Sequence, residues 1–255
     1  LPLIWIFFLL TAASAYCQVK VHDRLIDDRA VLKLGENTGT VIEDQDGFLW
    51  FGTNGSGLFR YDGISIKSFK TGLDSISDNY IFALFEDSEG IIWIGTRNGL
   101  NAYNKQTGKI TIFRHDPNDS NSLSHDAFAW GSRSIWESST GDIWIGTMKG
   151  LNRYDKGDKK FTRYLHNPND PHSLGHDIVY AGLEDSNGII WVATLGGGLN
   201  RFNKIENNFK RLTHDPNDAS SISDNSVMSL IEDKDGEIWA GTLAGGLNRL
   251  IKSSG

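Results

Sequence analysis

The sequence predicts an all-β protein built as a β-propeller of four-stranded antiparallel blades. The first observation is a pattern that recurs five times. An apolar run is followed by Glu and a turn that contains Gly, then by a Trp-containing strand that ends in Thr, and then by a run that begins with Leu. The second is its period, mostly in the forties, which is typical of propeller blades rather than helical repeats. The third is the abundance of Gly (28) and Trp (8), which favours many turns and aromatic-rich strands. The tryptophans that mark the repeat are Trp50, Trp93, Trp144, Trp191 and Trp239.

Length and composition narrow the class of protein. A chain of 255 residues is long enough to bury a sizeable core, and an aromatic content of 11% argues against disorder. The single Cys excludes a disulfide scaffold. A net charge of −7 without a Lys/Arg block argues against nucleic acid or an anionic membrane as the main partner.

Residues 1–15 are predicted to be a signal peptide without its basic start. The apolar run Leu1 to Leu10 is too short to span a membrane, and Ala13-Ser14-Ala15 supplies a cleavage pattern of small residues. Cys17 follows closely, but a Tyr precedes it where lipid attachment needs a small residue, so we expect cleavage rather than lipidation. Residues 16–37 form an N-terminal segment before the blades.

Each blade is predicted to contain four strands, A to D. Because the apolar runs of strand A do not alternate, they suit an inner strand that is buried on both faces. A hairpin turn with Gly leads to strand B, which carries the Trp, and a Gly-rich turn leads to strand C. Strand D alternates polar and apolar residues, as in Lys160 to Tyr164, and its cations suit an outer edge. The clearest strand A runs are Tyr80 to Phe85, Ile178 to Leu183 and Val227 to Ile231.

The pattern divides residues 38–255 into five blades, of which the last is incomplete. Seven blades at this period would need about 340 residues, so we expect the chain to represent part of a seven-bladed propeller. The alternative is a closed ring of five blades, in which Val19 to Leu25 supplies the missing fourth strand of blade five. The predicted blades are 38–72, 79–117, 125–168, 176–216 and 225–255.

Blade three carries an insertion that the other blades lack. From Ser124 to Glu137 is thirteen residues, whereas the equivalent stretch from Ser77 to Glu86 is nine. The four extra residues fall between 127 and 134 and bring Trp130 into the loop.

Several recurring residues are expected to serve the fold. The five Trp lie mid-strand before small residues, so packing between blades is expected rather than sugar stacking. The Asp-rich turns resemble the start of a calcium loop but lack its downstream bidentate Glu, so hairpin formation is expected instead. His115, His166 and His214 recur once per blade, too far apart to share a metal, and are expected to make turn hydrogen bonds. The sequence contains no catalytic or phosphate-binding motif, and no cofactor or metal is expected.

The candidate ligand-binding residues fall in connections that are expected to share one face. In a propeller, the loops from strand D to the next strand A emerge on the same side as the turns from strand B to strand C. Aromatic, cationic and polar side chains together suit a sugar ring or an acidic sugar. An ordinary surface loop is the alternative explanation for the insertion. The predicted ligand-binding residues are Asn79, Asp126, Asp177, Asn225, Trp130, Arg133, Arg97 and Lys149.

The repeat resembles a known family. Glu43 to Gly63 reads E-D-Q-D-G-F-L-W-F-G-T-N-G-S-G-L-F-R-Y-D-G and resembles the first blade of a two-component regulator propeller. Later I-W-I-G-T…G-L-N-R-Y and H-D-P-N-D…S-L-S runs resemble its following blades, so the resemblance covers about Thr38 to Leu250. It implies the exported sensor region of a hybrid two-component protein of Bacteroidetes-like bacteria. In that family a propeller usually has seven blades and often occurs as two in tandem. The propellers precede a β-sandwich, a membrane helix and a cytoplasmic histidine kinase.

The sequence therefore favours a periplasmic ligand-binding sensor with no catalysis of its own. The resemblance implies an oligosaccharide ligand, transcriptional control through the downstream kinase, and an inner-membrane parent protein that could dimerise. A propeller lyase or glycan-active enzyme is a second hypothesis, for which Asp126 beside His125 and Asp177 beside His176 are the hints. A secreted propeller that binds other proteins is a third.

Overall fold

The described part of the protein is made of five separate antiparallel sheets. The structure, a computed structural model, describes residues 38–72, 75–129 and 133–251. The first four sheets have four strands and the fifth has three, and neighbours in each sheet are consecutive in sequence. We call the sheets blades one to five and their strands A to D in chain order. The predicted all-β propeller architecture is confirmed.

The strands have the following bounds. Blade one comprises β1 (Thr38–Glu43), β2 (Leu49–Thr53), β3 (Leu58–Tyr61) and β4 (Ile66–Phe69). Blade two comprises β5 (Ile81–Glu86), β6 (Ile91–Thr96), β7 (Gly99–Asn104) and β8 (Ile110–Phe113). Blade three comprises β9 (Ile135–Glu137), β10 (Ile143–Thr147), β11 (Gly150–Asp155) and β12 (Lys160–Tyr164). Blade four comprises β13 (Val179–Glu184), β14 (Ile190–Thr194), β15 (Leu199–Asn203) and β16 (Asn208–Leu212). Blade five comprises β17 (Val227–Glu232), β18 (Ile238–Thr242) and β19 (Leu247–Leu250).

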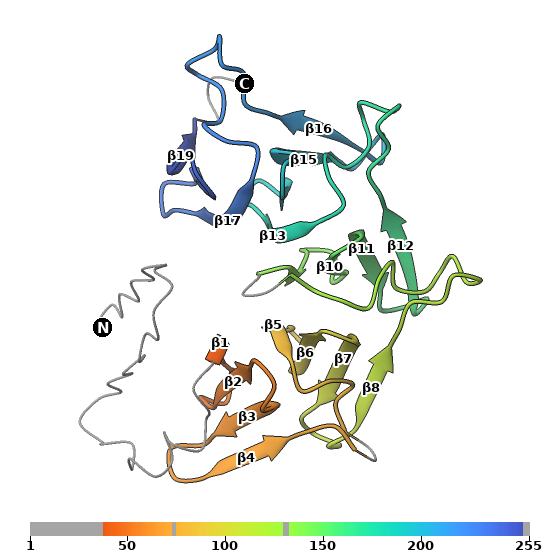
Figure 1. Cartoon of the computed structure of the whole chain (residues 1–255). Helices are drawn as coiled ribbons and strands as arrows, with labels where there is room; N and C mark the ends of the chain where they lie inside the picture. The colour runs from red at the N-terminus through yellow and green to blue at the C-terminus, as the bar shows by residue number, and fades with distance from the viewer. Residues whose placement is uncertain (1–37, 73–74, 130–132, 252–255) are drawn as a thin grey trace.

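The blades follow one another in an arc, with strand A of each blade on the inside and strand D on the outside (Figure 1). Contacts join each inner strand to the next: β1 to β5, β5 to β9, β9 to β13 and β13 to β17. Each blade therefore depends mainly on its immediate neighbours, as in other repeat proteins. No helix long and apolar enough to cross a membrane is present among the residues described.

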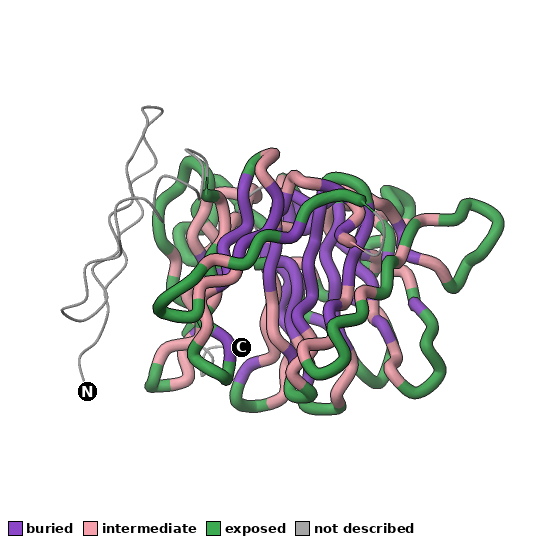
Figure 2. Tube along the Cα trace, turned by 90° about the horizontal axis from the view of Figure 1, so that it is seen from below, coloured by how far each residue is buried: buried purple, intermediate pink, exposed green. Residues whose placement is uncertain are grey.

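The core lies in the seams, by which we mean the side chains packed between adjacent blades. Trp50 is fully buried and stacks on Phe69 of its own blade, with ring centroids 5.5 Å apart. It also contacts Tyr103 of blade two, 5.7 Å away. The middles of the strands are buried, whereas the turns at both ends are exposed (Figure 2). The expected packing role of the strand B tryptophans is thus confirmed.

A glycine in strand B allows the blades to approach closely. A Cβ atom on Gly146 would lie 2.4 Å from Cγ1 of Val179, which opens strand A of the next blade. A Cβ atom on Gly52 would lie 2.7 Å from Cγ2 of Ile81 across the first seam. Across the second seam, Gly95 instead faces the ring of Phe128, which precedes the insertion of blade three. Phe128 therefore fills the place that a β-branched residue takes elsewhere.

The inner strands differ in two ways from the sequence prediction. They begin one residue later than predicted in blades two and four, and burial is mixed rather than complete on both faces. In blade five, Ile231 is 51% exposed because no further blade covers that face among the described residues. In blade three, the insertion shortens strand A to three residues, and Arg133 pairs in parallel with Ala181 of blade four.

Candidate ligand-binding face

The D-to-A connections and the B-to-C turns meet on one side of the molecule, which we call the loop face. The carbonyl oxygen of Asp126, in the connection that leads into blade three, accepts a hydrogen bond from the N–H of Gly99, which ends the B-to-C turn of blade two and begins β7 (2.8 Å). The carbonyl oxygen of Asp177 accepts the equivalent hydrogen bond from the N–H of Gly150 (2.6 Å). The prediction that these two kinds of connection share a face is confirmed.

The side chains of the predicted polar residues on this face fasten the loops. Oδ1 of Asp126 accepts the backbone N–H of His115 (2.6 Å), which begins the same connection eleven residues earlier. Asp177 accepts His166 N–H in the same way (2.7 Å). Since each side chain closes its own loop while its carbonyl holds the preceding blade, these residues position the loop face. Two amide side chains make the equivalent bond: Asn79 accepts the N–H of Thr71 at 3.0 Å, and Asn225 accepts the N–H of His214 at 2.7 Å.

Arg97 lies at the start of the B-to-C turn of blade two, and its side chain contacts two residues that precede strand A of that blade. Its guanidinium carbon lies 4.1 Å from the ring centroid of Tyr80, a cation–π contact. Its Nε lies 3.3 Å from Oδ2 of Asp78, which is largely buried. The Arg97 side chain nevertheless remains 58% exposed, so its planar, charged group is held in place and faces solvent. Tyr80 and Asp78 were missed by sequence reasoning, because the repeat does not place a Tyr or an Arg here in other blades.

The remaining predicted residues, Lys149, Arg133 and Trp130, all belong to blade three and the insertion that precedes its inner strand. Lys149 lies in the B-to-C turn of blade three and is exposed, next to Met148, which is 39% exposed. Arg133 is exposed at the end of the insertion, where its carbonyl accepts Gly182 N–H of blade four at 3.3 Å. Trp130 lies outside the described residues. The structure therefore places Arg97 and Lys149 at B-to-C turns of the loop face, whereas Arg133 pairs with Ala181 within the inner strand of blade four.

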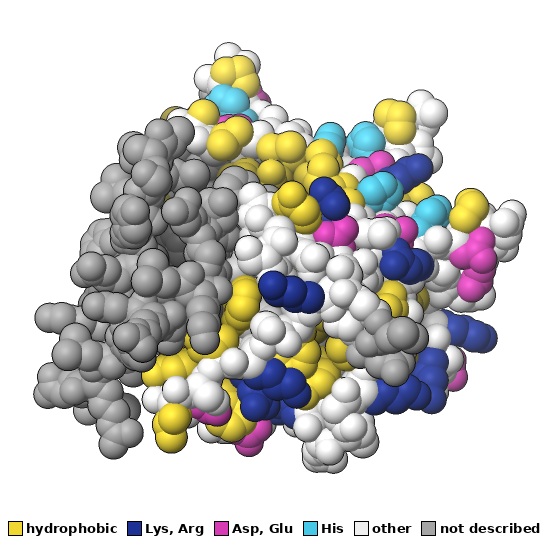
Figure 3. Space-filling model, turned by 60° about the horizontal axis from the view of Figure 1, so that its bottom comes forward, with side chains coloured by type: hydrophobic (Ala, Val, Ile, Leu, Met, Phe, Trp, Pro, Cys, Tyr) yellow, Lys and Arg dark blue, Asp and Glu magenta, His cyan; other side chains and the backbone are white. Residues whose placement is uncertain are grey.

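The histidines of the loop face bond to the backbone through Nδ1. His115 and His166 donate from Nδ1 to the carbonyls of Leu123 and Leu174, both at 2.8 Å. His125 and His176 instead accept the backbone N–H two residues later. Figure 3 shows the histidines along one rim of the molecule. Among the residues described, no hydrogen bond joins His125 to Asp126 or His176 to Asp177, and no group of His, Cys, Asp and Glu is arranged to hold a metal ion.

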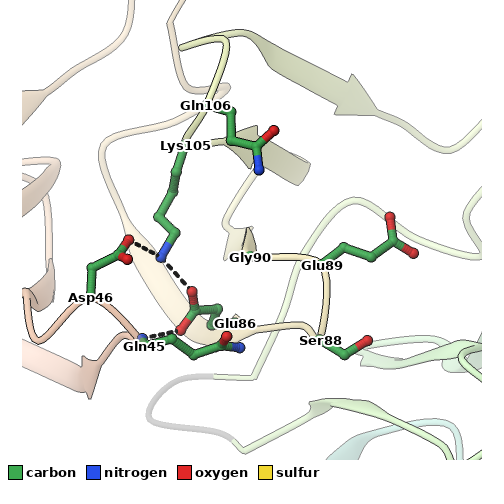
Figure 4. A pocket seen from close by; sticks show the side chains of 8 residues that line it. All are labelled: Gln45, Asp46, Glu86, Ser88, Glu89, Gly90, Lys105 and Gln106. Atoms are coloured by element: carbon green, nitrogen blue, oxygen red, sulfur yellow. Dashed lines mark hydrogen bonds and ion pairs between the residues drawn. The ribbon is translucent and has the colours of Figure 1, made fainter.

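The opposite side, which we call the turn face, is held together by ion pairs across the seams. Lys105 of blade two lies 2.7 Å from Asp46 and 3.4 Å from Asp44, both in the A-to-B turn of blade one. It also lies 2.5 Å from Glu86 of its own blade. Asp46, Glu86 and Lys105 line a cleft of about 330 Å³ between the two blades (Figure 4). One lysine thus pairs with carboxylates of two blades, so these groups form a structural joint between the blades.

The pKa values of this joint shift in the directions that favour the charged forms. Burial would raise the pKa of Asp44, but hydrogen bonds from Trp50 and Phe48 and the charge of Lys105 hold it below its usual value. Burial would lower the pKa of Lys105, but its hydrogen bonds to Asp46 and Glu86 raise it above its usual value.

Comparison with known families identifies the repeat. A family model described as the two component regulator propeller matches residues 34–55, 75–98 and 221–244. These segments contain the A-to-B hairpins of blades one, two and five. The chain carries two-component regulator propeller repeats.

The solved and curated relatives that this chain matches are much longer proteins. The extracellular domain assigned to a hybrid two-component system of B. thetaiotaomicron is 25% identical, with a TM-score of 0.71 over 86% of this chain and 29% of that chain. Histidine kinase P4 of Formosa agariphila is 39% identical over 64 residues, which are 23% of this chain and 5% of the relative. This chain thus spans only a small part of the length of either relative.

An enzyme shares the fold as well. Virginiamycin B lyase of Staphylococcus aureus superposes with a TM-score of 0.58 over 84% of this chain and 69% of that chain, at 16% identity. At that identity the likeness shows the propeller fold alone.

Proposed function

We propose that this chain is the exported, ligand-sensing propeller of a two-component system and that its ligand binds on the loop face. The observation that carries the proposal is the likeness, over 86% of the chain, to an extracellular domain of a hybrid two-component system. The predicted signal peptide at residues 1–15 supports export to the periplasm. The downstream partners would be a β-sandwich and a histidine kinase in the parent protein.

The chemistry of the loop face supports an oligosaccharide, in particular one that carries an acidic group. Arg97 presents a fixed, exposed guanidinium above an aromatic ring, and guanidinium groups bind carboxylates through paired hydrogen bonds. Lys149 and Arg133 add exposed positive charge from the neighbouring blade. Asp126 and Asp177 each have a second carboxylate oxygen for sugar hydroxyls, since Oδ1 is used in closing the loop.

The proposed signal would pass through the loops to the seams. Asp126 is bonded to the loop before blade three by its side chain and to blade two by its carbonyl. A ligand that contacts the B-to-C turn of blade two would therefore act on two blades at once. In the parent protein, such a change in packing would be transmitted by the domains that follow.

The Arg97→Ala variant tests the site. If Arg97 binds an acidic sugar, the variant should bind such an oligosaccharide about 10- to 100-fold more weakly, the usual loss for a charge-assisted hydrogen-bonding group. Isothermal titration of the purified chain with neutral and uronic-acid-containing oligosaccharides measures this. Arg97→Lys keeps the charge but loses the planar group, so its affinity should lie between those of the unaltered chain and of Arg97→Ala.

The control is Lys160→Ala, which removes an exposed cation from the outer edge of blade three. Its affinity should equal that of the unaltered chain. Equal binding by the Arg97→Ala and Lys160→Ala variants would contradict the proposed site. The same incubations, analysed for breakdown of the oligosaccharide, distinguish a sensor from a lyase.

A further inference from the structure

The A-to-B turns of four blades share a carboxylate that gathers the same set of N–H donors. In blade one, Oδ1 of Asp44 accepts the backbone N–H groups of Asp46 and Phe48, at 3.0 and 2.9 Å. Its Oδ2 accepts Nε1–H of Trp50 at 2.8 Å. The corresponding Trp-to-Asp bonds are Trp93–Asp87 at 2.9 Å, Trp191–Asp185 at 2.9 Å and Trp239–Asp233 at 2.7 Å.

Blade three keeps the donors but not the carboxylate. Ser138 takes the place of the Asp, and its hydroxyl is bonded to that of Thr140 (2.8 Å). Trp144 is 2% exposed, and its Nε1 has no hydrogen-bond partner. Within the described chain, no hydrogen bond is found from the backbone N–H groups of Thr140 and Asp142, the counterparts of Asp46 and Phe48. A buried N–H group without an acceptor is costly, so this turn favours an added acceptor.

A lysine of the following blade adds positive charge at the same place. Lys105 lies 3.4 Å from Asp44, and Lys156 lies 3.1 Å from Asp87, each in the turn of the preceding blade. Their counterpart beside the turn of blade three is Lys204, which lies 2.7 Å from Glu184 of its own blade. Lys204 is 44% exposed, whereas Lys105 is 13% exposed. In the repeat, Lys204 occupies the position of the lysines that pair with the turn of the preceding blade. Its partner Glu184 also accepts the hydroxyl of Ser139 in the turn of blade three, at 2.8 Å.

We propose that the A-to-B turn of blade three binds a small monovalent anion, of the size of chloride, where the other blades have an Asp carboxylate. Because a serine stands where the other blades have a carboxylate of two oxygens, we expect the turn to admit a single-atom ion and not sulfate or phosphate. The donors would be Trp144 Nε1, the amides of Thr140 and Asp142, and Lys204. The Asp142 carboxylate lies in the same turn, where it accepts the Thr140 hydroxyl (3.0 Å), so we expect the anion to bind weakly.

The first test measures thermal unfolding of the full chain in sodium chloride and in sodium gluconate at equal ionic strength. Chloride should raise the melting temperature by about 2–4 °C, because a ligand that binds only the folded state stabilises it. Ser138→Asp supplies the carboxylate covalently, so this variant should melt higher in gluconate and lose the response to chloride. Thr107→Asp, which adds the same charge to an exposed turn of blade two, should retain the response.

The second test locates the ion. Crystals grown in bromide should show an anomalous peak within hydrogen-bonding distance of Trp144 Nε1, and crystals of Ser138→Asp should not. Two results would overturn the proposal: a bound water with no anomalous signal at this position, or an equal chloride response in the unaltered chain and in Ser138→Asp.

Discussion

At the scale of single residues, one Asp in the A-to-B turn of four blades determines much of the local structure. Asp87 is 1% exposed, accepts the N–H groups of Glu89 and Ile91, and bonds Trp93 through its second oxygen. It also lies 3.1 Å from Lys156 of the next blade. A single carboxylate thus closes a turn, orients the buried indole and joins two blades.

The variant Asp87→Ser would reproduce in blade two the turn that blade three has naturally. It should lower the free energy of unfolding by about 2–3 kcal/mol, because it leaves a buried indole N–H, two turn amides and part of a buried ion pair without their acceptor. Urea denaturation followed by circular dichroism measures the loss. Asp158→Ser, in an exposed turn, should cost less than about 0.5 kcal/mol. An equal loss in the two variants would show that the buried carboxylate has no special role.

At the scale of strands and blades, the strand B glycine sets how closely the sheets approach. Blade four has Ala193 at this position, in the same apolar cluster as Val227, so the separation of the sheets is adjusted seam by seam. Blade three has Gly146 and leaves no room for a methyl group against Val179.

The variant Gly146→Ala should therefore destabilise the protein by about 1–3 kcal/mol, the usual cost of overpacking a core. Val179→Ala should recover part of this loss when it is combined with Gly146→Ala, although it is itself destabilising. A double-mutant cycle from urea denaturation gives the coupling between the two positions. Gly72→Ala, in an exposed loop with no atoms near the added methyl, serves as the control. Strict additivity of the two changes would contradict the tight seam.

At the scale of the whole molecule, the charged joints of the turn face predict how stability depends on pH. The pKa values of Asp44 and Glu184 are lowered in the folded state, from ordinary values of 3.8 and 4.5. As the pH falls through these values, the unfolded chain takes up protons before the folded protein does, so stability is lost. The pKa of Lys105 is raised above 10.5, so its contribution is complete below that pH and is lost as the pH rises further.

We therefore expect a plateau of stability from about pH 5 to about pH 10, with a decline below it. Melting temperatures measured by circular dichroism across this range test the expectation. Lys105→Met should lower the plateau and make the acid decline shallower, because the pKa of Asp44 then returns toward its ordinary value. A decline of unchanged steepness would show that this joint does not contribute.

The repeat made most of the fold predictable and little of the candidate site. Trp spacing and turn residues are local signals, so the blades, the strand order and the packing role of the tryptophans could be predicted from sequence. The insertion of blade three breaks the local pattern, and the replacement of its inner-strand residue by Phe128 could not be anticipated. The candidate site depends on contacts between residues distant in sequence: Arg97 acquires its geometry from Asp78 and Tyr80, which belong to the preceding connection.

The exception in blade three also gives the protein a natural spectroscopic label. Hydrogen bonding to a carboxylate withdraws electron density from an indole N–H proton and moves its magnetic resonance downfield. Four strand B tryptophans have that bond, and Trp144 does not. Its resonance should therefore be distinct from theirs, and changes in the third blade could be followed in solution without attaching any probe.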